Sequence, residues 1–481
     1  MIETSLGEIA GWVDGVLQNA DPATPVRAPA THDSRSVIPG GLFVAVAGEH
    51  VDGHDFAADA VAAGAVGCLV ARPVGAPSIV VDNPVVALGR LARAVTGRLA
   101  DCMTIGLTGS QGKTTTKDLL AEVLGRQGPT VAPVGSFNTE IGVPLTVLRA
   151  DADTSFLVIE MGARGKGHIA YLCELTQPQV GLVLNVGVAH VGEFGSREGI
   201  AEAKGELVEA LPSDGMAVLN ADDPLVREMA SRTKGRVLTF GEDPHADVRI
   251  DGLRLDAGGR PRFDLTYDGS TAPVAMRLLG RHQASNAAAA AAVALGVGLE
   301  LSTVATSLSE AAPASRWRME PHERADGVLI LNDSYNANPD SMRAALDTLS
   351  SVAAARPEGR AIAVLGPMRE LGPAGDEAHR EIGEYAVQRG VGTVVVVDRD
   401  AQPIQRGAEA AGAEHSVLVP DATAAVEWLE PRLRAGDVVL VKASRADGLE
   451  RVARALVTQA GDTASETAAS PNEGEGSTDA R

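Results

Sequence analysis

The sequence predicts an α/β protein built from three domains, and three observations lead to this prediction. Short apolar, β-branched runs alternate with alanine-rich helical stretches along the chain, a pattern typical of parallel sheets covered by helices. At residues 104–120, TIGLTGSQGKTTTKDLL passes from an apolar run through glycines to residues at helical spacing, which indicates strand, loop and helix. The length of 481 residues suits about three domains of roughly 100 to 200 residues each.

The first domain is expected to span residues 1–83. Its apolar runs predict strands near residues 42–46, 67–70 and 79–81. Two polar loops separate them, with the sequences HDSRSVIPGG and GEHVDGHDF. We expect this small domain to bind a ligand through these loops.

The second domain is expected to span residues 84–313. It contains the glycine loop, a strand-like extension near residues 243–276 and a helix in GRHQASNAAAAAAVALGVG. Its other apolar runs predict strands at 156–159, 180–186 and 217–219.

The third domain is expected to span residues 314–460. The linker EAAPASRWRMEPHER, with two prolines and a cluster of charges, precedes it. Strands are predicted at 328–331, 361–365, 393–397 and 438–441. The last 21 residues, 461–481, are acidic and hold no residue suited to a core, so we expect a disordered acidic tail.

The composition of the chain argues against some classes of function and cellular location. The formal net charge is −21, which argues against nucleic acid as a partner because a polyanion would be repelled. The three cysteines are far apart and lack metal-ligand spacing, which favours a reducing compartment. No signal sequence or membrane span is evident. We therefore expect a cytoplasmic protein.

The glycine loop predicts a phosphate site. Its backbone N–H groups can converge on phosphate oxygens at a helix N-terminus, Lys113 can neutralise charge, and the Thr114 hydroxyl can coordinate Mg²⁺. The spacing departs from the usual motif, because Leu107 stands five residues before Gly112 and Gly106 comes one residue too early. A turn that happens to begin a helix is the alternative.

Lys204 is unusual for its position in a helix. In GSREGIAEAKGELVEAL the apolar face holds Ile200, Leu207, Val208 and Leu211, and Lys204 lies on that same face. An inward lysine is costly unless it is paired or chemically altered. The alternative is a side chain that runs along the helix edge to water.

Other polar residues follow predicted strands. Glu160 ends FLVIE and His190 ends VGLVLNVGVAH, and the carboxyl ends of parallel strands form the usual ligand crevice. Together with Thr114 and Lys204, they predict a site for a metal and a nucleotide. Taken singly, Glu160 and His190 are each as well explained as polar residues at a strand end whose hydrogen bonds are made within the protein.

In the third domain, two loops follow buried strands. NDSYNANPDSM carries Asp333, Ser334, Tyr335, Asn336 and Asn338, and KASRADG carries three further polar residues that suit an anionic substrate group, which are Lys442, Ser444 and Arg445. A purely structural turn is the alternative for both loops.

Several of these stretches resemble the Mur ligases. They are the glycine loop, FNTEIGVPLTVLR, IEMGARG, NVGVAHVGEFGS, AKGEL, GRHQASNAAAAAA and NDSYNANPDSM. The resemblance runs from the first polar loops to about Gln459. The SYNANP stretch is similar to the branch that adds D-alanyl-D-alanine, and not to relatives that add a single amino acid.

The resemblance implies a three-domain Mur ligase architecture, with a central P-loop ATPase domain and a C-terminal Rossmann-like domain. It also implies that ATP phosphorylates the terminal carboxylate of UDP-N-acetylmuramoyl-tripeptide. The amino group of D-alanyl-D-alanine (D-Ala-D-Ala) then attacks this acyl phosphate, which gives the pentapeptide precursor of peptidoglycan. Competing interpretations are a sister or folate-type ligase that adds one amino acid, and a nucleotide-binding regulator without catalysis.

The resemblance also assigns roles by position. Lys113, Glu160, His190 and Lys204 would be catalytic. Thr114 and Glu160 would hold Mg²⁺, His190 would support a second Mg²⁺, and Lys204, carbamylated by CO₂, would be an anionic metal ligand. The ATP site would comprise Thr108, Gly109, Ser110, Gln111, Gly112, Lys113, Thr114, Asn286, Arg316 and Asp333.

The resemblance locates the substrate-binding residues less precisely than the ATP and metal sites. The first domain would bind the UDP part through its loops, the central loop would line the path to the metal, and the third domain would seat the dipeptide; these residues are Ser34, Arg35, His54, Asn138, Thr139, Asn336, Asn338, Lys442, Ser444 and Arg445. Three departures from the family pattern, Pro367, Ala443 and Ser315, put the loop geometry of the third domain in question. We expect the chain to act as a monomer.

Overall fold

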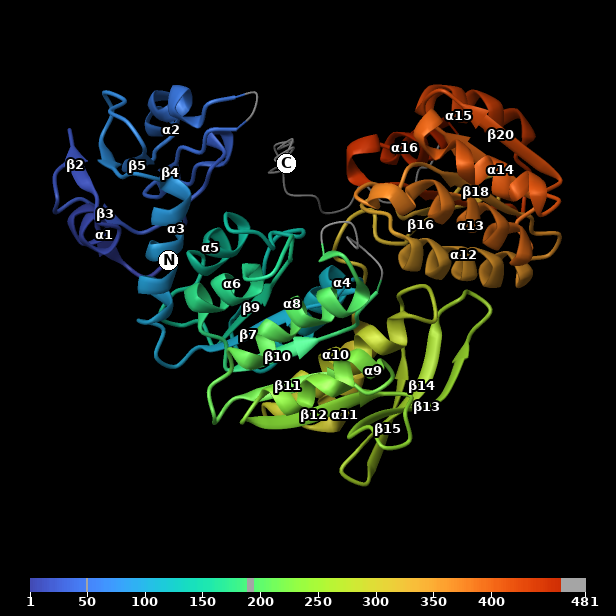
Figure 1. Ribbon diagram of the computed structural model, residues 1–481, viewed down its shortest axis with the longest axis horizontal. Helices are drawn as coiled ribbons and strands as arrows, with labels where there is room; N and C mark the ends of the chain where they lie inside the picture. Colours follow the sequence, from blue (N-terminus) through green and yellow to red (C-terminus); the bar gives the residue numbers. More distant parts are fainter. Residues whose placement is uncertain (49–50, 188–193, 460–481) are drawn as a thin grey trace.

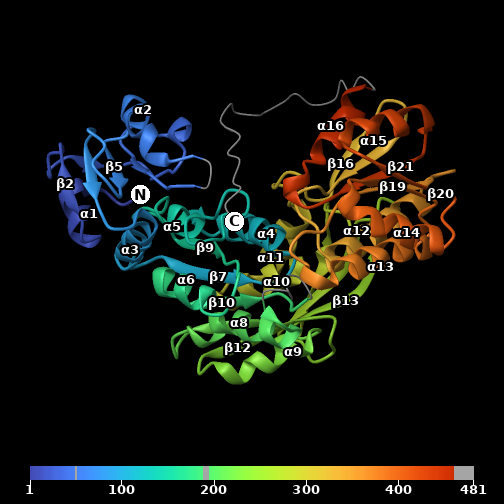
Figure 2. The same ribbon diagram turned by 45° about the horizontal axis from the view of Figure 1, so that its top comes forward.

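The computed structural model describes residues 1–48, 51–187 and 194–459. Figure 1 shows three α/β units in chain order, and Figure 2 shows the central unit between the other two. The predicted tail and His190 lie outside the described residues. The predicted α/β class with three units is confirmed, whereas the exact domain boundaries remain predictions.

The first unit holds a small mixed sheet. Over the described residues its order is β2-β6-β5-β4, and β1 pairs separately with β3. Asn83 caps the next helix by accepting from the Val85 and Val86 N–H groups, and Pro84 occupies its first turn. The elements are β1 (Thr4–Ser5), α1 (Leu6–Trp12), β2 (Val16–Gln18), β3 (Pro25–Val26), β4 (Leu42–Val44), α2 (Ala57–Ala62), β5 (Gly67–Val70), β6 (Ser78–Val80) and α3 (Pro84–Thr96).

The central unit holds a long sheet in the order β15-β14-β13-β12-β11-β10-β7-β9-β8 among the residues described. Strands β7 to β13 pair in parallel, while β13, β14 and β15 pair antiparallel. The predicted strand-like extension is this antiparallel part. The strands are β7 (Met103–Thr108), β8 (Thr130–Val131), β9 (Phe156–Glu160), β10 (Val180–Val183), β11 (Met216–Asn220), β12 (Arg236–Gly241), β13 (Val248–Leu255), β14 (Pro261–Tyr267) and β15 (Ser270–Ala275).

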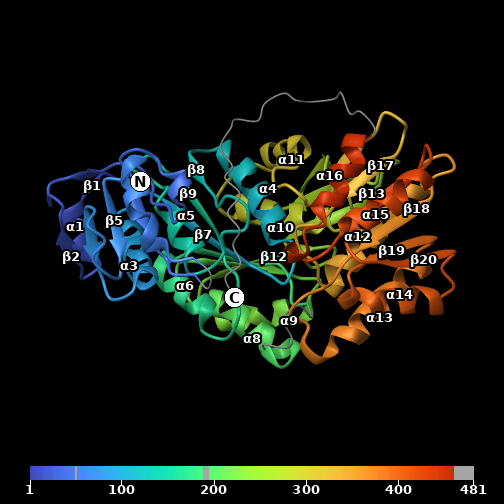
Figure 3. The ribbon, with the colours of Figure 1, turned by 90° about the horizontal axis from the view of Figure 1, so that it is seen from above.

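Helices cover both faces of this sheet, as Figure 3 shows. Successive strand residues point to opposite faces, so Leu182 packs with α4 and α10 whereas Val183 packs with α3, α6 and α8. The helices are α4 (Lys113–Gly125), α5 (Gly142–Val147), α6 (His168–Thr176), α8 (Arg197–Glu209), α9 (Pro224–Arg227), α10 (Gln283–Gly296) and α11 (Leu301–Glu310).

Helix α10 explains the run of alanines. Its residues 287–294 are fully buried, because the helix is enclosed by α4, α11 and the sheet. Alanine is the strongest helix former and is small enough to let these elements approach closely. The helix therefore brings its first turn, with Asn286, close to the glycine loop.

The third unit is a six-stranded sheet in the order β16-β17-β21-β18-β19-β20, counted over the described part of the chain. Only the pair β16–β17 in this sheet is antiparallel among the described strands. The elements are β16 (Glu320–Glu323), β17 (Leu329–Asn332), α12 (Pro339–Ala354), β18 (Ala361–Leu365), α13 (Gly375–Gln388), β19 (Thr393–Val397), α14 (Gln402–Ala410), β20 (His415–Val419), α15 (Ala422–Leu429), β21 (Val438–Lys442) and α16 (Glu450–Gln459).

The antiparallel extension also contacts the third unit. At the β13–β14 turn, a Cβ on Gly259 would lie 2.5 Å from Val352 Cγ2 of α12, and Figure 1 shows this hairpin beside α12. The β13–β14 turn of the central unit therefore packs against α12 of the third unit. None of the described helices is long and apolar enough to cross a membrane.

Candidate active site

The glycine loop joins β7 to α4 as predicted. Gly112 adopts a left-handed backbone with φ of 80° and caps α4, which a residue with a side chain adopts only at a cost. Asn185 Oδ1 accepts hydrogen bonds of 3.0 Å from the Ser110 and Gln111 N–H groups. These two amides are thus occupied by the chain itself, and the N–H groups at the start of α4 are those that remain for phosphate.

The predicted strand 180–186 ends earlier, at Val183. Asn185 leaves the sheet because both its backbone carbonyl and its side chain accept hydrogen bonds from the glycine loop. The end of β10 therefore holds the loop in shape.

Gly112→Ala is expected to lower the free energy of unfolding by about 1–3 kcal/mol, because the left-handed backbone is unfavourable for alanine. The new Cβ would also lie 2.4 Å from Asn286 Oδ1, so nucleotide binding should weaken as well. Urea unfolding and calorimetric titration with ADP would measure both effects. Gly125→Ala is the matched control in the same helix, since its Cβ would meet no atom within 4 Å. Equal stability of the two variants would contradict this account of the loop.

Lys113 bends back over the loop. Its Nζ donates a 2.8 Å hydrogen bond to the Gly109 carbonyl. Burial lowers the pKa of Lys113, while the nearby Glu160 carboxylate raises it. The amine is thus held at the place where a phosphate would meet the loop.

Glu160 is the last residue of β9 and is almost completely buried. Its Oε1 accepts a 2.8 Å hydrogen bond from Asn138 Nδ2, whereas its buried Oε2 has no hydrogen-bond partner. A buried carboxylate oxygen without a partner is costly. This oxygen is suited to a cation.

Lys204 lies on the buried face of α8 and is 6% exposed. It does not run along the helix edge to water, which was the alternative that its position in the sequence left open. Burial, followed by repulsion from Lys113, lowers the pKa of Lys204 well below its usual value. Burial and the nearby Lys113 thus both disfavour the charged form of this amine.

A feature missed by sequence reasoning is Arg318. Its Nη2 donates a 3.1 Å hydrogen bond to the Thr114 hydroxyl, and its buried Nε has no hydrogen-bond partner. The predicted linker arginine, Arg316, is exposed and stays a predicted nucleotide contact, while Arg318 is the arginine that contacts Thr114. Two left-handed residues, Trp317 with φ of 58° and Met319 with φ of 52°, turn the linker so that Arg318 points inward.

Asp333 and Lys442 are engaged with each other. Asp333 Oδ2 accepts a 2.6 Å hydrogen bond from Lys442 Nζ, and its Oδ1 accepts one of 3.1 Å from the Met319 N–H. Burial lowers the pKa of Lys442 and the neighbouring Asp333 raises it. In this conformation the pair supports the linker, and the predicted binding roles of Asp333 and Lys442 stay predictions.

Other predicted substrate residues of the third domain also have structural partners. Asn338 caps α12 by accepting from the Ser341 N–H at 2.8 Å, and the Ser444 hydroxyl accepts from the Arg369 N–H at 3.0 Å. Asn336 and Arg445 are exposed, and the Arg445 guanidinium lies 4.1 Å from the centre of the Trp317 ring.

The departures from the family pattern have local roles. The Pro367 carbonyl accepts from the Ser444 N–H, and Ala443 occupies the space beside Gly366, where a Cβ on the glycine would lie 2.7 Å away. Ser315 lines a cavity beside α4.

The predicted residues of the first domain are tied to their own loops. Arg35 pairs with Asp33 at 2.9 Å, and Ser34 begins the short turn capped by Asp33. His54 is buried, and its Nε2 accepts a 2.8 Å hydrogen bond from the Ala71 N–H. Thr139, in the central unit, accepts from the Gly142 N–H at the start of α5.

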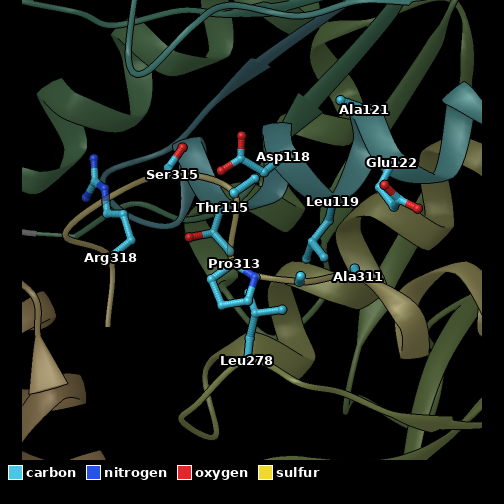
Figure 4. A pocket seen from close by; sticks show the side chains of 12 residues that line it. Thr115, Asp118, Leu119, Ala121, Glu122, Leu278, Ala311, Pro313, Ser315 and Arg318 are labelled. Carbon is cyan, nitrogen blue, oxygen red and sulfur yellow. The ribbon is translucent and has the colours of Figure 1, made fainter. Parts of the chain in front are cut away.

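A cavity of about 280 Å³ lies beside the glycine loop. Figure 4 shows it between α4 and the chain that leads into the linker, with Arg318 and Ser315 at one side. Its lining combines polar and apolar groups, among them Thr115, Asp118, Leu119, Leu278, Pro313 and Arg318. Among the residues that the structure describes, no cluster of three His, Cys, Asp or Glu side chains is arranged to hold a metal.

Comparison with known families matches this architecture unit by unit. A model of the Mur ligase middle domain matches residues 107–294, one of the Mur ligase, glutamate ligase domain matches 317–445, and one of the Mur ligase family, catalytic domain matches 30–96. The chain belongs to the Mur ligase family. The Mur ligase middle domain contains the glycine loop, Glu160 and Lys204.

Individual Mur ligases are similar over nearly the whole chain. A UDP-N-acetylmuramoyl-tripeptide--D-alanyl-D-alanine ligase from Mycobacterium tuberculosis (strain ATCC 25618 / H37Rv) is 46% identical, with 95% of this chain and 98% of that protein covered. The enzyme of the same name from Escherichia coli (strain K12) is 36% identical, with 95% and 99% covered.

Solved structures agree. A crystal structure of MurF from Acinetobacter baumannii has a TM-score of 0.85 at 30% identity, covering 95% of this chain and 99% of that one. MurF ligase from Thermotoga maritima in complex with ADP has a TM-score of 0.78 at 31% identity, covering 90% and 98%.

Proposed function

We propose that this Mur ligase joins D-Ala-D-Ala to UDP-N-acetylmuramoyl-tripeptide with the conversion of ATP to ADP and phosphate. The shared name of its relatives supports the substrates. The observation that carries the chemistry is the grouping of the half-buried Lys113 with the buried Glu160 and Lys204 beside the glycine loop and Thr114. A regulator that only binds nucleotide has no need at this place for a buried lysine without a carboxylate partner among the described residues.

The reaction has to activate a carboxylate, which is a poor electrophile. An oxygen of the tripeptide's terminal carboxylate displaces ADP from the γ-phosphorus. The dipeptide nitrogen then attacks the acyl carbon, the C–O bond to phosphate breaks, and the nitrogen loses one proton, which leaves with the released phosphate. Lys113 and the N–H groups at the start of α4 stabilise charge on the transferred phosphoryl group. The unpartnered Nε of Arg318 provides a further donor to a phosphate oxygen.

The residues present fit a magnesium ion. The unpartnered Glu160 Oε2 and the buried Thr114 hydroxyl are oxygen donors of the kind that Mg²⁺ prefers. When bound, the ion neutralises charge on the phosphates. Carbamylated Lys204 and His190 complete the proposed set, although His190 lies outside the described residues.

Carbamylation of Lys204 is supported by its environment. The neutral amine lone pair attacks the carbon of CO₂, an N–C bond forms and one amine proton leaves. Only an unprotonated amine can do this, and burial beside Lys113 favours that state. The product is an anion, which replaces the repulsion between Lys204 and Lys113 with an attraction.

We further propose where the substrates bind. The cavity beside α4 suits the nucleoside part of ATP, with Asn286 at the loop; the first domain, residues 1–83, binds the UDP part through Ser34, Arg35 and His54. The central domain covers 84–313, and in the third, 314–460, the exposed Asn336 and Arg445 face the dipeptide. We place the enzyme in the cytoplasm as a monomer.

An amine-selectivity assay tests this function. The protein would be incubated with ATP, Mg²⁺ and UDP-N-acetylmuramoyl-tripeptide, and ADP release and product mass would be followed with each amine. D-Ala-D-Ala is expected to accelerate ADP release and to give the pentapeptide. Acceleration by a single amino acid, or by glutamate with a folate acceptor, would overturn the proposal in favour of a sister activity. Binding of ATP without any ligation would favour the regulator.

A further inference from the structure

Tyr335 contacts two other segments of the chain, the linker at residues 317–318 and the loop that holds Ser136. Its ring centre lies 4.1 Å from the guanidinium of Arg318. Its hydroxyl is hydrogen-bonded to Ser136 Oγ, and its N–H donates to the Trp317 carbonyl at 3.3 Å. One side chain of the third domain thus contacts both the linker and a loop of the central domain.

Through its ring, Tyr335 acts on the linker arginine. A guanidinium stacked on an aromatic face is restrained in its plane, and Arg318 in this orientation reaches the Thr114 hydroxyl. The linker backbone is held from the other side, because Glu320 Oε2 accepts from the Trp317 N–H at 3.1 Å. The ring therefore sets the direction in which Arg318 presents its donors to the glycine loop.

Through its hydroxyl, Tyr335 acts on the opposite side of the site. Ser136 lies two residues before Asn138, whose side-chain amide donates to Glu160 Oε1. The same loop is anchored further back, where Lys117 Nζ donates to the Pro133 carbonyl at 3.0 Å. With both anchors in place, Asn138 turns Glu160 so that its other oxygen stays without a partner.

We infer that Tyr335 is a positioning residue that couples the third domain to the two sides of the proposed magnesium site. It acts on Thr114 through Arg318, and on Glu160 through Ser136 and Asn138. The inference rests on the proposed function, and it gives Tyr335 a different role from contact with the dipeptide. When the third domain docks on the central domain, the contacts of Tyr335 therefore also orient the residues that would bind the metal.

The test uses Tyr335→Phe, Ser136→Ala and the double variant. Each single change is expected to weaken binding of a non-hydrolysable ATP analogue in the presence of Mg²⁺, and to lower kcat, by about three- to tenfold, the effect of one lost hydrogen bond. The Mg²⁺ concentration for half-maximal binding should rise as well. The double variant should be no worse than either single variant, because both changes remove the same hydrogen bond.

A second substitution at Tyr335 separates the contribution of the ring from that of the hydroxyl. Tyr335→Leu is expected to lose more than Tyr335→Phe, since it removes the stacking on Arg318 in addition to the hydroxyl. Tyr385→Phe is the matched control. Its hydroxyl donates to Asp347 at 2.7 Å and its ring lies beside Arg343 and Arg389, in a comparable arrangement that involves only the third domain. Its binding and kinetics should equal those of the parent protein.

Three results would overturn the inference. One is a Tyr335→Phe variant that raises only the KM for D-Ala-D-Ala and binds the nucleotide analogue normally, which would make Tyr335 a dipeptide contact. Another is a double variant whose losses are the product of the single losses. The third is no change in either single variant. Calorimetric binding of the Mg²⁺–analogue complex does not require ligation, so a parent protein that fails to join D-Ala-D-Ala would refute the proposed function separately.

Discussion

Lys113→Ala is expected to reduce turnover by roughly 10²- to 10³-fold, which is the usual loss when one donor to a developing charge is removed. Lys113 is the side chain that lies across the glycine loop, with its amine on the Gly109 carbonyl. In the proposed reaction it moves onto the phosphates, where negative charge spreads over the transferred oxygens. Without it, the carboxylate is not activated and no acyl phosphate forms at a useful rate.

Two measurements check this prediction. Release of ADP in the presence of both substrates gives the turnover, and urea unfolding shows that the variant is folded. Lys234→Ala, which changes an exposed lysine of the same domain, should keep full activity. A Lys113→Ala enzyme with nearly normal turnover would remove the glycine loop from the chemistry.

Lys204→Met is expected to inactivate the enzyme and yet to stabilise the fold. Among the described residues no carboxylate pairs with Lys204, and Lys113 repels its charged form. Replacing a buried amine that lacks such a partner with an apolar side chain of similar length is expected to be neutral or stabilising by about 1–3 kcal/mol, because an uncompensated buried polar group is costly. A loss of both stability and activity would mean that the lysine is a structural element of the core.

The same residue predicts a dependence of stability on pH. The pKa of Lys204 is lowered in the folded state, so between that lowered value and 10.5 the unfolded chain binds more protons. Stability should therefore rise with pH across this window. Lys204→Met should make the slope smaller but should not abolish it, because Lys113 and Lys442 are shifted in the same direction. Urea unfolding in CO₂-free buffer at pH 7 and pH 9 measures the slope.

Carbamylation has its own test. Lys204→Ala is expected to regain part of its turnover when short carboxylates are added, because they replace the missing anion. The parent enzyme should lose activity when bicarbonate is removed and recover when it is restored. Activity that does not respond to bicarbonate would count against a carbamate at Lys204.

Much of the fold was predictable because its signals are local. The strands at 361–365 and 393–397 match β18 and β19 residue for residue, since short β-branched runs between helices are characteristic of buried parallel strands. The strand predicted at 180–186 was too long, because Asn185 satisfies its hydrogen bonds with the glycine loop of another strand. No local pattern reports such a partner 74 or 75 residues away.

The candidate site was predictable only in part. Glu160 and Lys204 could be found from their positions at a strand end and on an apolar helix face. The two linker arginines could not be told apart in the sequence, because Arg316 and Arg318 have similar neighbours. The outcome depends on the left-handed conformations at Trp317 and Met319, which the third domain imposes through Asp333 and Tyr335.

The amino-acid order by itself determined the three α/β units, the glycine loop between strand and helix, and the inward lysine, because periodicity and side-chain polarity act within one element. The tertiary structure alone decided how the linker meets the loop, that Asp333 is engaged by Lys442, and that Tyr335 contacts both Arg318 and Ser136. These are contacts between domains, and they form only where backbone conformation and packing bring distant segments together.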